Sequence, residues 1–132
     1  MEILLKGGIA MVSAALVLAW LGTFARWFVI KGVDGGVVKD YGLLIKAHID
    51  YILMALFCFA FYGAATAGGY HLPAAACWLV VIGGMTNPSI FVIAMLKTDF
   101  WNNVLWKVYT ALSFMITTCG FVWVSHAFVT AM

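Results

Sequence analysis

Charged residues are scarce in this 132-residue sequence, where Asp, Glu, Lys and Arg together make up only 9%. Soluble domains carry about 25% charged residues, so the composition argues against a soluble globular fold. The net charge of +2 provides no basic surface of the kind that binds nucleic acid. A chain of this length predicts one domain and leaves no room for a separate soluble catalytic module.

Long polar segments are also lacking. Four hydrophobic runs with very few charges fill almost the whole sequence, at residues 3–28, 43–67, 72–96 and 104–130. Each run is at least as long as the ~20 residues that a helix needs to cross the hydrocarbon core of a bilayer. None alternates between apolar and polar residues as a membrane β-barrel requires, and helices are the other way to satisfy the backbone in lipid. We therefore predict a single all-α domain, 1–132, an integral membrane bundle of four transmembrane helices. The first run is too long for a signal-peptide core, and we expect it to be a mature helix.

Several chemical signatures are missing as well. The three cysteines, Cys58, Cys77 and Cys119, have no metal-ligand spacing, and we expect them to be buried small apolar residues. The seven methionines form no cluster with His and Cys that would favour copper. No internal repeat indicates an inverted-repeat transporter. The first run has no acidic residue after Glu2, whereas a proton-coupled multidrug exporter would need an intramembrane carboxylate there.

Basic residues gather on one side of the predicted bundle. Six lie in or beside the first and third connections, namely Arg26, Lys31, Lys39, Lys46, Lys97 and Lys107. The side that holds both termini and the second connection has only Lys6. Because cytoplasmic loops carry the excess of Lys and Arg, we predict that the first and third connections face the cytoplasm. Both termini would then face outward, in a bacterial inner membrane.

Glycine, proline and tryptophan mark the connections between the predicted helices. The first connection, 29–42, is glycine-rich and indicates a flexible surface excursion. Gly68 and Gly69 are expected to end the second helix, and Pro73 suits the first turn of the third. Trp101 in the third connection is expected at the depth of the membrane interface.

The second hydrophobic run opens with ionisable residues, which are costly inside a bilayer and so need a reason. Lys46 can reach the headgroups, and Asp50 then lies about 6 Å deeper, at ~1.5 Å per residue. Asp50 is either paired to Lys46 at the helix end or part of a site with Tyr51. His48 is either an interfacial histidine bonded to a carbonyl or headgroup, or an axial metal ligand whose other ring nitrogen is fixed by a neighbour. His71 and His126 lie near the opposite side, and we expect them to be interfacial.

The third run carries Asn87 and Pro88 near its middle. Pro88 removes a backbone donor and crowds the carbonyl of Gly84, which predicts a kink. Asn87 either forms an interhelical hydrogen bond that only holds the bundle together or lines a pocket. We expect a candidate pocket in the cytoplasmic half of the bundle, formed by His48, Asp50, Tyr51, Asn87 and Ser113. Small residues at helical spacing are expected to permit close helix packing, namely Ser113, Thr117 and Gly120 on the fourth helix and Ala60 and Ala64 on the second.

Two short motifs and the helix count resemble a known family. Leu5-Lys6-Gly7-Gly8 precedes one long helix and a polar loop, Ala47-His48 opens the second helix, and Asn87 lies within the third. This pattern resembles the membrane isomerases typified by styrene oxide isomerase, and the hydroxylaminobenzene mutases are similar. The resemblance implies a four-helix protomer in a homotrimer, with haem b between neighbouring subunits and His48 as the ligand of its iron. It further implies that ferric haem acts as a Lewis acid on an epoxide, giving a carbonyl product.

The resemblance also suggests roles for the surrounding residues. Arg26, Lys31 and Lys46 lie at the depth where haem propionates would emerge, while Asn87, Tyr51 and Asp50 are the candidate catalytic residues. A small apolar substrate would reach them from the lipid.

The sequence departs from the family at several positions. Met54 stands where members have Asn, and Gly83 and Phe91 stand where the isomerase has Asp and Tyr. The loop charges favour outward termini, whereas the isomerase would have inward ones. Haem binding tolerates these changes more easily than the reaction does. A second hypothesis is therefore a non-catalytic small subunit or assembly partner of a larger membrane complex.

Overall fold

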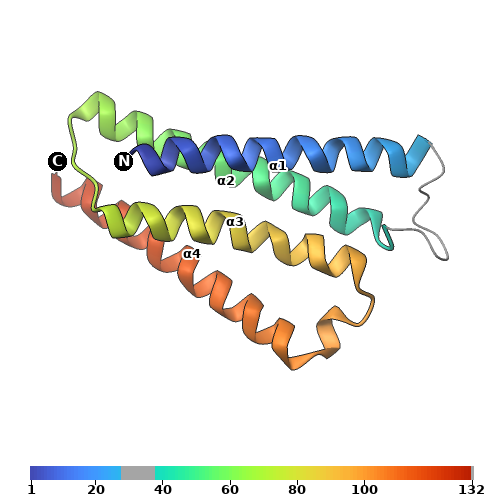
Figure 1. The fold of residues 1–132 in the computed structure, drawn as a ribbon. Coiled ribbons are helices and arrows are strands. Elements are labelled where there is room, and N and C mark those ends of the chain that lie inside the picture. The colour runs from blue at the N-terminus through green and yellow to red at the C-terminus, as the bar shows by residue number, and fades with distance from the viewer. Residues whose placement is uncertain (28–37, 132) are drawn as a thin grey trace.

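The computed structural model describes residues 1–27 and 38–131 and consists of four long helices (Figure 1). They are α1 (Glu2–Trp27), α2 (Tyr41–Gly68), α3 (Ala74–Leu96) and α4 (Val104–Ala131), and a 3-10 turn, η1 (Phe100–Asn102), precedes α4. Each long helix has the length and apolar composition needed to cross a membrane. The predicted all-α, four-helix membrane fold is confirmed, and no helix end differs from its predicted position by more than two residues. Most of the first predicted connection, including Lys31, lies outside the described residues.

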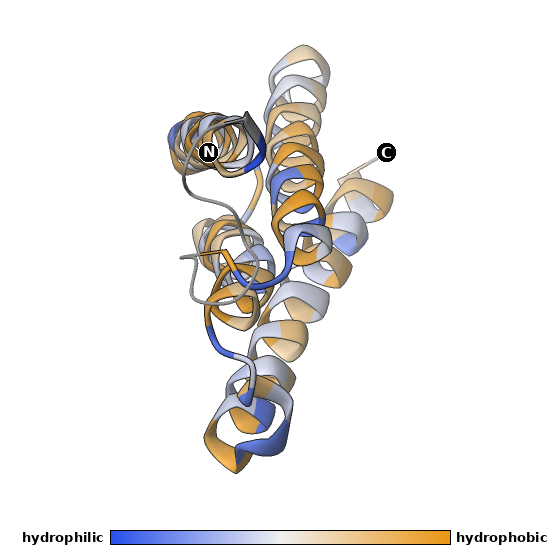
Figure 2. Ribbon diagram, turned by 90° about the vertical axis from the view of Figure 1, so that its right-hand side faces the viewer, coloured by the Kyte–Doolittle hydropathy of each residue, from blue (hydrophilic) through white to orange (hydrophobic). Residues whose placement is uncertain are grey.

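The helices run up and down, so both termini and the α2–α3 connection share one end of the bundle (Figure 1). The α1–α2 and α3–α4 connections share the other end, where hydrophilic residues gather (Figure 2). Helix α3 packs against α1, α2 and α4, and α4 packs mainly on α3. The bundle therefore has the alternating topology that the sequence predicts, with α3 at its centre.

Local chemistry sets the ends of α2. Asp40 is its N-cap and accepts a hydrogen bond from the Leu43 amide at 3.1 Å, which satisfies an otherwise unpaired donor of the first turn. At the other end Gly69 adopts φ 68°, a left-handed conformation that glycine takes without steric cost. The Tyr70 amide donates to Ala65 O at 2.9 Å, and this reversal closes the helix where the glycine pair predicts. Pro73 lies at the N-cap of α3, one residue ahead of the predicted first turn.

Small residues allow the central helices to approach closely. Gly83 of α3 lies against the backbone of Thr117 in α4, and Gly120 of α4 lies against the backbone at Val80. The expected role of the small residues on α4 is thus confirmed. Ala60 and Ala64 of α2 are instead exposed on the outside of the bundle.

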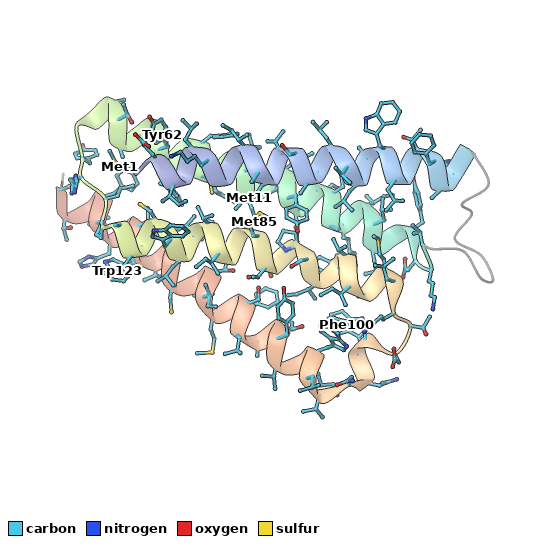
Figure 3. All side chains as sticks on the ribbon, viewed as in Figure 1. Met1, Met11, Tyr62, Met85, Phe100 and Trp123 are labelled. Atoms are coloured by element: carbon cyan, nitrogen blue, oxygen red, sulfur yellow. The ribbon has the colours of Figure 1, made fainter. Side chains whose placement is uncertain are left out.

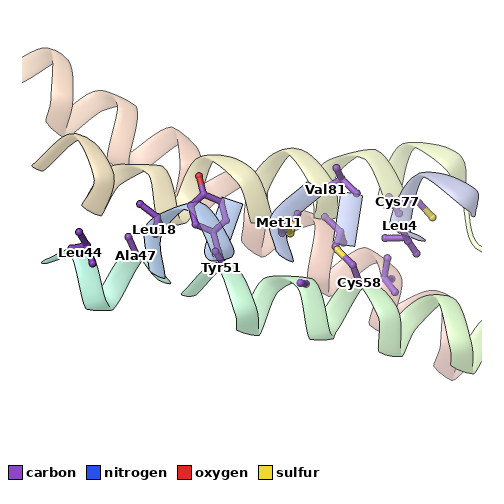
Figure 4. Close-up of a cluster of buried hydrophobic side chains, with 14 of the residues drawn as sticks. Leu4, Met11, Leu18, Leu44, Ala47, Tyr51, Cys58, Cys77 and Val81 are labelled. Atoms are coloured by element: carbon purple, nitrogen blue, oxygen red, sulfur yellow. The ribbon is translucent and has the colours of Figure 1, made fainter. Parts of the chain in front are cut away.

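Larger apolar side chains fill the remaining space between the helices. Leu4, Met11 and Leu18 of α1 meet the buried face of α2 and α3 (Figure 4). Phe100, which is fully buried, occupies the space where α3 and α4 diverge (Figure 3). As predicted, Cys58 and Cys77 are buried, but Cys119 is exposed on the outer face of α4.

Candidate functional site

His48 lies at the contact between α1 and α2, with its side chain half-buried. Its Nδ1 is 2.8 Å from the backbone carbonyl oxygen of Ala15, a buried residue of α1. A carbonyl only accepts hydrogen bonds, so Nδ1 must carry the proton. In the neutral imidazole this leaves Nε2 with a free lone pair. The orientation is the one that a metal-binding histidine needs, because ligating histidines usually donate their other N–H to a carbonyl or carboxylate.

The surface around His48 is apolar. Leu16 of α1 and Ile45, Ile49 and Ile52 of α2 are all exposed. Such a surface suits lipid, a second copy of the chain or a flat apolar group held between two copies. Described residues contain no group of three or more His, Cys, Asp or Glu side chains able to hold a metal ion. A single imidazole is too small a donor set for a bare metal ion, whereas a haem ring would bring the remaining ligands itself.

The predicted propionate partners lie toward the end of the bundle that carries the α1–α2 connection. Arg26 is in the last turn of α1 and Lys46 in the first turns of α2, and both side chains are exposed. Asp50, further along α2, is partly exposed. Throughout residues 1–27 and 38–131 the single ion pair is Lys6 with Glu2, at 3.3 Å, so Asp50 is not paired to Lys46.

A second polar group surrounds Pro88. The proline-turn cluster consists of Tyr51 from α2, Thr86 and Ser89 from α3, and Tyr109 and Ser113 from α4. Figure 4 shows Tyr51 directed toward α3, and its hydroxyl donates to Met85 O at 3.3 Å.

Hydrogen bonds join this cluster to α4. The hydroxyls of Ser89 and Tyr109 are 2.8 Å apart, and those of Thr86 and Ser113 are 2.9 Å apart. Both of the first two hydroxyls also lie within hydrogen-bond distance of Thr86 O, at 2.8 Å for Ser89 and 3.1 Å for Tyr109, and each has one proton to share between that oxygen and the other hydroxyl.

Pro88 explains why these hydroxyls gather there. Proline lacks the N–H that would bond Gly84 O, so α3 loses one backbone hydrogen bond within the apolar span, although it remains a continuous helix. Transmembrane helices tolerate proline when neighbouring helices and hydroxyl side chains supply hydrogen bonds to the local backbone. Here hydroxyls from α2, α3 and α4 donate to the carbonyls of Met85 and Thr86. The cluster thus ties three helices together at the turn that proline weakens.

Asn87, next to Pro88, is the buried polar residue that this cluster does not include. Its side chain is 7% exposed, and its Oδ1 is buried without a hydrogen-bond partner. Leaving a buried acceptor unsatisfied costs roughly 1–3 kcal/mol, and such a group in a folded chain needs an explanation. The interhelical hydrogen bond considered for Asn87 is not formed through this oxygen.

The structure divides the predicted pocket between two places. His48 bonds to α1, whereas Tyr51 and Ser113 join the proline-turn cluster. Across the described ranges no hydrogen bond links His48 to that cluster. Sequence reasoning missed Thr86 and Ser89 as members, although hydroxyl residues flanking an intramembrane proline are a usable signal for such a cluster.

We compared the chain with known protein families, curated proteins and solved structures. No protein-family model matches the chain, no curated protein is significantly similar to it, and no solved structure matches its fold.

Proposed function

We propose that this chain is a haem-binding membrane protein of the isomerase type, with His48 as the axial ligand. The hydrogen bond from His48 Nδ1 to Ala15 O carries the proposal, because it fixes the ring and leaves Nε2 to bind iron. Ala15 is buried in the core, so its carbonyl is a rigid partner. The apolar residues beside His48 offer a surface for the face of a porphyrin.

Each remaining site residue has a role that its position allows. Arg26 and Lys46 would hold the propionates, since both are exposed cations at the end of the bundle nearer to His48. Haem bound there would supply Lewis-acid chemistry toward an oxygen of the substrate. Asn87 remains a candidate for orienting the polar atom of a small apolar substrate, although its side chain is buried within one protomer in this structure. Tyr51 and Asp50 remain candidates for orienting that substrate, although the Tyr51 hydroxyl is bonded to Met85 O in this structure.

A homotrimer completes the proposed site. In one protomer the outer faces of α1 and α2 beside His48 are exposed and apolar, so a neighbouring copy would be needed to enclose a bound haem. Association of the copies also keeps the haem out of contact with lipid. The substrate partitions from the bilayer into the dry space between them.

An absorption spectrum of the detergent-purified protein tests the proposal. We expect a Soret band in the wild type and its loss in His48→Ala. His71→Ala is the matched control, because His71 is exposed at the opposite end of the bundle. A wild-type protein that stays colourless after reconstitution with haem overturns the proposal.

The reaction needs a separate test. We expect the haem-loaded protein to convert an aryl epoxide to the corresponding aldehyde, and we expect Asn87→Leu to slow this conversion without removing the Soret band. If the haem-loaded protein leaves epoxides unchanged, the proposed haem binding stands and the proposed isomerase activity is refuted.

The second candidate is a small subunit of a larger membrane complex. Packing of α4 mainly on α3 favours it, because apolar residues of α4 such as Leu105, Met115 and Val129 are more than 60% exposed and are available to another membrane chain. Co-purification with other chains at a fixed ratio, without a chromophore, is the result that this function requires. An isolated stable homo-oligomer that binds haem is the opposite result.

A further inference from the structure

A pocket opens at the end of the bundle that carries the α1–α2 and α3–α4 connections. Its volume is about 240 Å³, and it is lined by Lys39, Asp40, Leu43, Ala94, Lys97, Thr98 and Trp101. None of these residues belongs to the proposed haem site or to the proline-turn cluster. The pocket is therefore a separate feature that needs its own explanation.

One backbone hydrogen bond builds this pocket. The Lys39 amide donates to Met95 O at 2.9 Å, which ties the segment entering α2 to the last turn of α3. Lys39 and Lys97 are far apart in the sequence, and this bond brings them to the same pocket. Two exposed cations converge there because the fold holds them together.

The lining combines charge, a hydrogen-bond donor and an apolar floor. Lys97 Nζ lies 4.9 Å from the centre of the Trp106 ring, which restrains this ammonium group by a cation–π contact. Thr98 contributes a hydroxyl, and Leu43 and Ala94 provide apolar surface. The Asp40 carboxylate opposes the lysines, but its Oδ1 accepts a hydrogen bond from the Leu43 amide.

We propose that this pocket binds the phosphate-bearing headgroup of an anionic phospholipid. Basic pockets between transmembrane helices at the membrane surface are suited to anionic headgroups. Trp101, 49% exposed at the rim, is the residue type that lies at headgroup depth. Pockets for whole small-molecule ligands are roughly 300–1,000 Å³, so this smaller pocket fits a compact headgroup whose acyl chains remain in the bilayer.

Free phosphate is also an anion and is the competing source of the ligand. The apolar floor formed by Leu43 and Ala94 favours the lipid, because inorganic phosphate gains nothing from apolar contacts. Phosphatidylcholine has the same phosphate but no net negative charge. Comparing its binding with that of an anionic lipid therefore shows whether the pocket recognises the negative charge or any phospholipid headgroup.

Lipid binding to the purified full chain in detergent micelles tests the proposal. The protein is titrated with short-chain phosphatidylglycerol, and bound lipid is measured by native mass spectrometry. Each basic residue near a membrane surface contributes about 1 kcal/mol to binding anionic lipid, so we expect Lys39→Gln and Lys97→Gln to weaken binding about five-fold each. Asp40→Asn keeps an N-cap residue but removes the opposing charge, so we expect it to tighten binding.

Lys107→Gln is the matched control, since Lys107 is an exposed lysine at the same end of the bundle but does not line the pocket. The proposal is overturned if the double variant of Lys39 and Lys97 binds as tightly as the Lys107 control. Equal binding of phosphatidylcholine, or displacement of the lipid by inorganic phosphate at the same concentration, would also overturn it. His48→Ala should bind the lipid normally, so haem binding and lipid binding can fail independently.

Discussion

Gly83 of α3 lies directly against Thr117 of α4, and a Cβ added to Gly83 would be 2.6 Å from Thr117 Cα. Backbone atoms cannot swing aside as the end of a flexible side chain can, so any larger residue here must push α4 away. The close approach of α4 gives a physical reason why this chain has glycine there.

Replacing Gly83 should therefore destabilise the α3–α4 contact. We expect Gly83→Ala to lower the free energy of unfolding by about 1–3 kcal/mol, the usual effect of overpacking a well-packed core. Gly63→Ala is the control, because nothing lies within 4 Å of its added Cβ on exposed α2 surface. Unfolding in mixed detergent micelles, followed by circular dichroism, measures both. Equal stability of the two variants would contradict the close contact.

Removing the Tyr51 hydroxyl should weaken the link between α2 and α3. Tyr51→Phe deletes the hydrogen bond to Met85 O, and such bonds contribute about 0.6 kcal/mol on average inside membranes. Tyr62→Phe serves as the control, since in the described part of the chain its hydroxyl makes no hydrogen bond. The same unfolding assay separates the two variants, and a larger loss for Tyr62→Phe would refute the assignment.

Ser89 and Tyr109 should be energetically coupled. Their hydroxyl oxygens are 2.8 Å apart and both lie within hydrogen-bond distance of Thr86 O. The two protons are shared among these three contacts, so removing one hydroxyl changes what the other contributes. In a double-mutant cycle of Ser89→Ala and Tyr109→Phe we expect a coupling energy of about 0.6 kcal/mol. The pair Ser89→Ala and Thr66→Ala should be additive, because the Thr66 hydroxyl donates to Tyr62 O within α2 and is not part of the proline-turn cluster. Additivity in the first pair would show that the two hydroxyls do not act together.

Asn87 should be dispensable for stability. Leucine has a similar size and no polar atom, so Asn87→Leu removes an acceptor that has no partner. We expect the free energy of unfolding to rise by about 1 kcal/mol. If the free energy of unfolding instead falls by about 1 kcal/mol, the Asn87 amide has a hydrogen-bond partner in the membrane-embedded assembly and stabilises that assembly.

Orientation in the membrane can be measured with reporter fusions. The described lysines and arginines at the α1–α2 and α3–α4 connections outnumber Lys6 at the other end, so the positive-inside rule predicts that these connections face the cytoplasm. Alkaline phosphatase, which is active only outside the cytoplasm, should be active when fused to the C-terminus and inactive when fused after Asp99. The reverse pattern of phosphatase activity would mean that the C-terminus faces the cytoplasm, and the predicted orientation would be wrong.

Much of the fold follows from the sequence alone, because lipid restricts the possible structures so strongly. Four apolar runs of sufficient length must become helices, and short connections make neighbours antiparallel. The glycine pair at Gly68 and Gly69 also marks the end of α2 correctly. The sequence also pointed to His48 and Asn87, because polar groups in a span are rare enough to be noticed individually.

Only the tertiary structure decided which of these groups meet. Periodicity places His48 and Tyr51 on one side of α2, yet His48 bonds to α1 and Tyr51 to α3. Helix rotation and crossing decide this, and they depend on contacts such as Gly83 with Thr117 that join distant parts of the chain. The same holds for the pocket between Lys39 and Lys97, since one hydrogen bond between α3 and the segment before α2 creates it. Hydrophobicity determines which segments enter the membrane, while side-chain packing determines which of their faces come together.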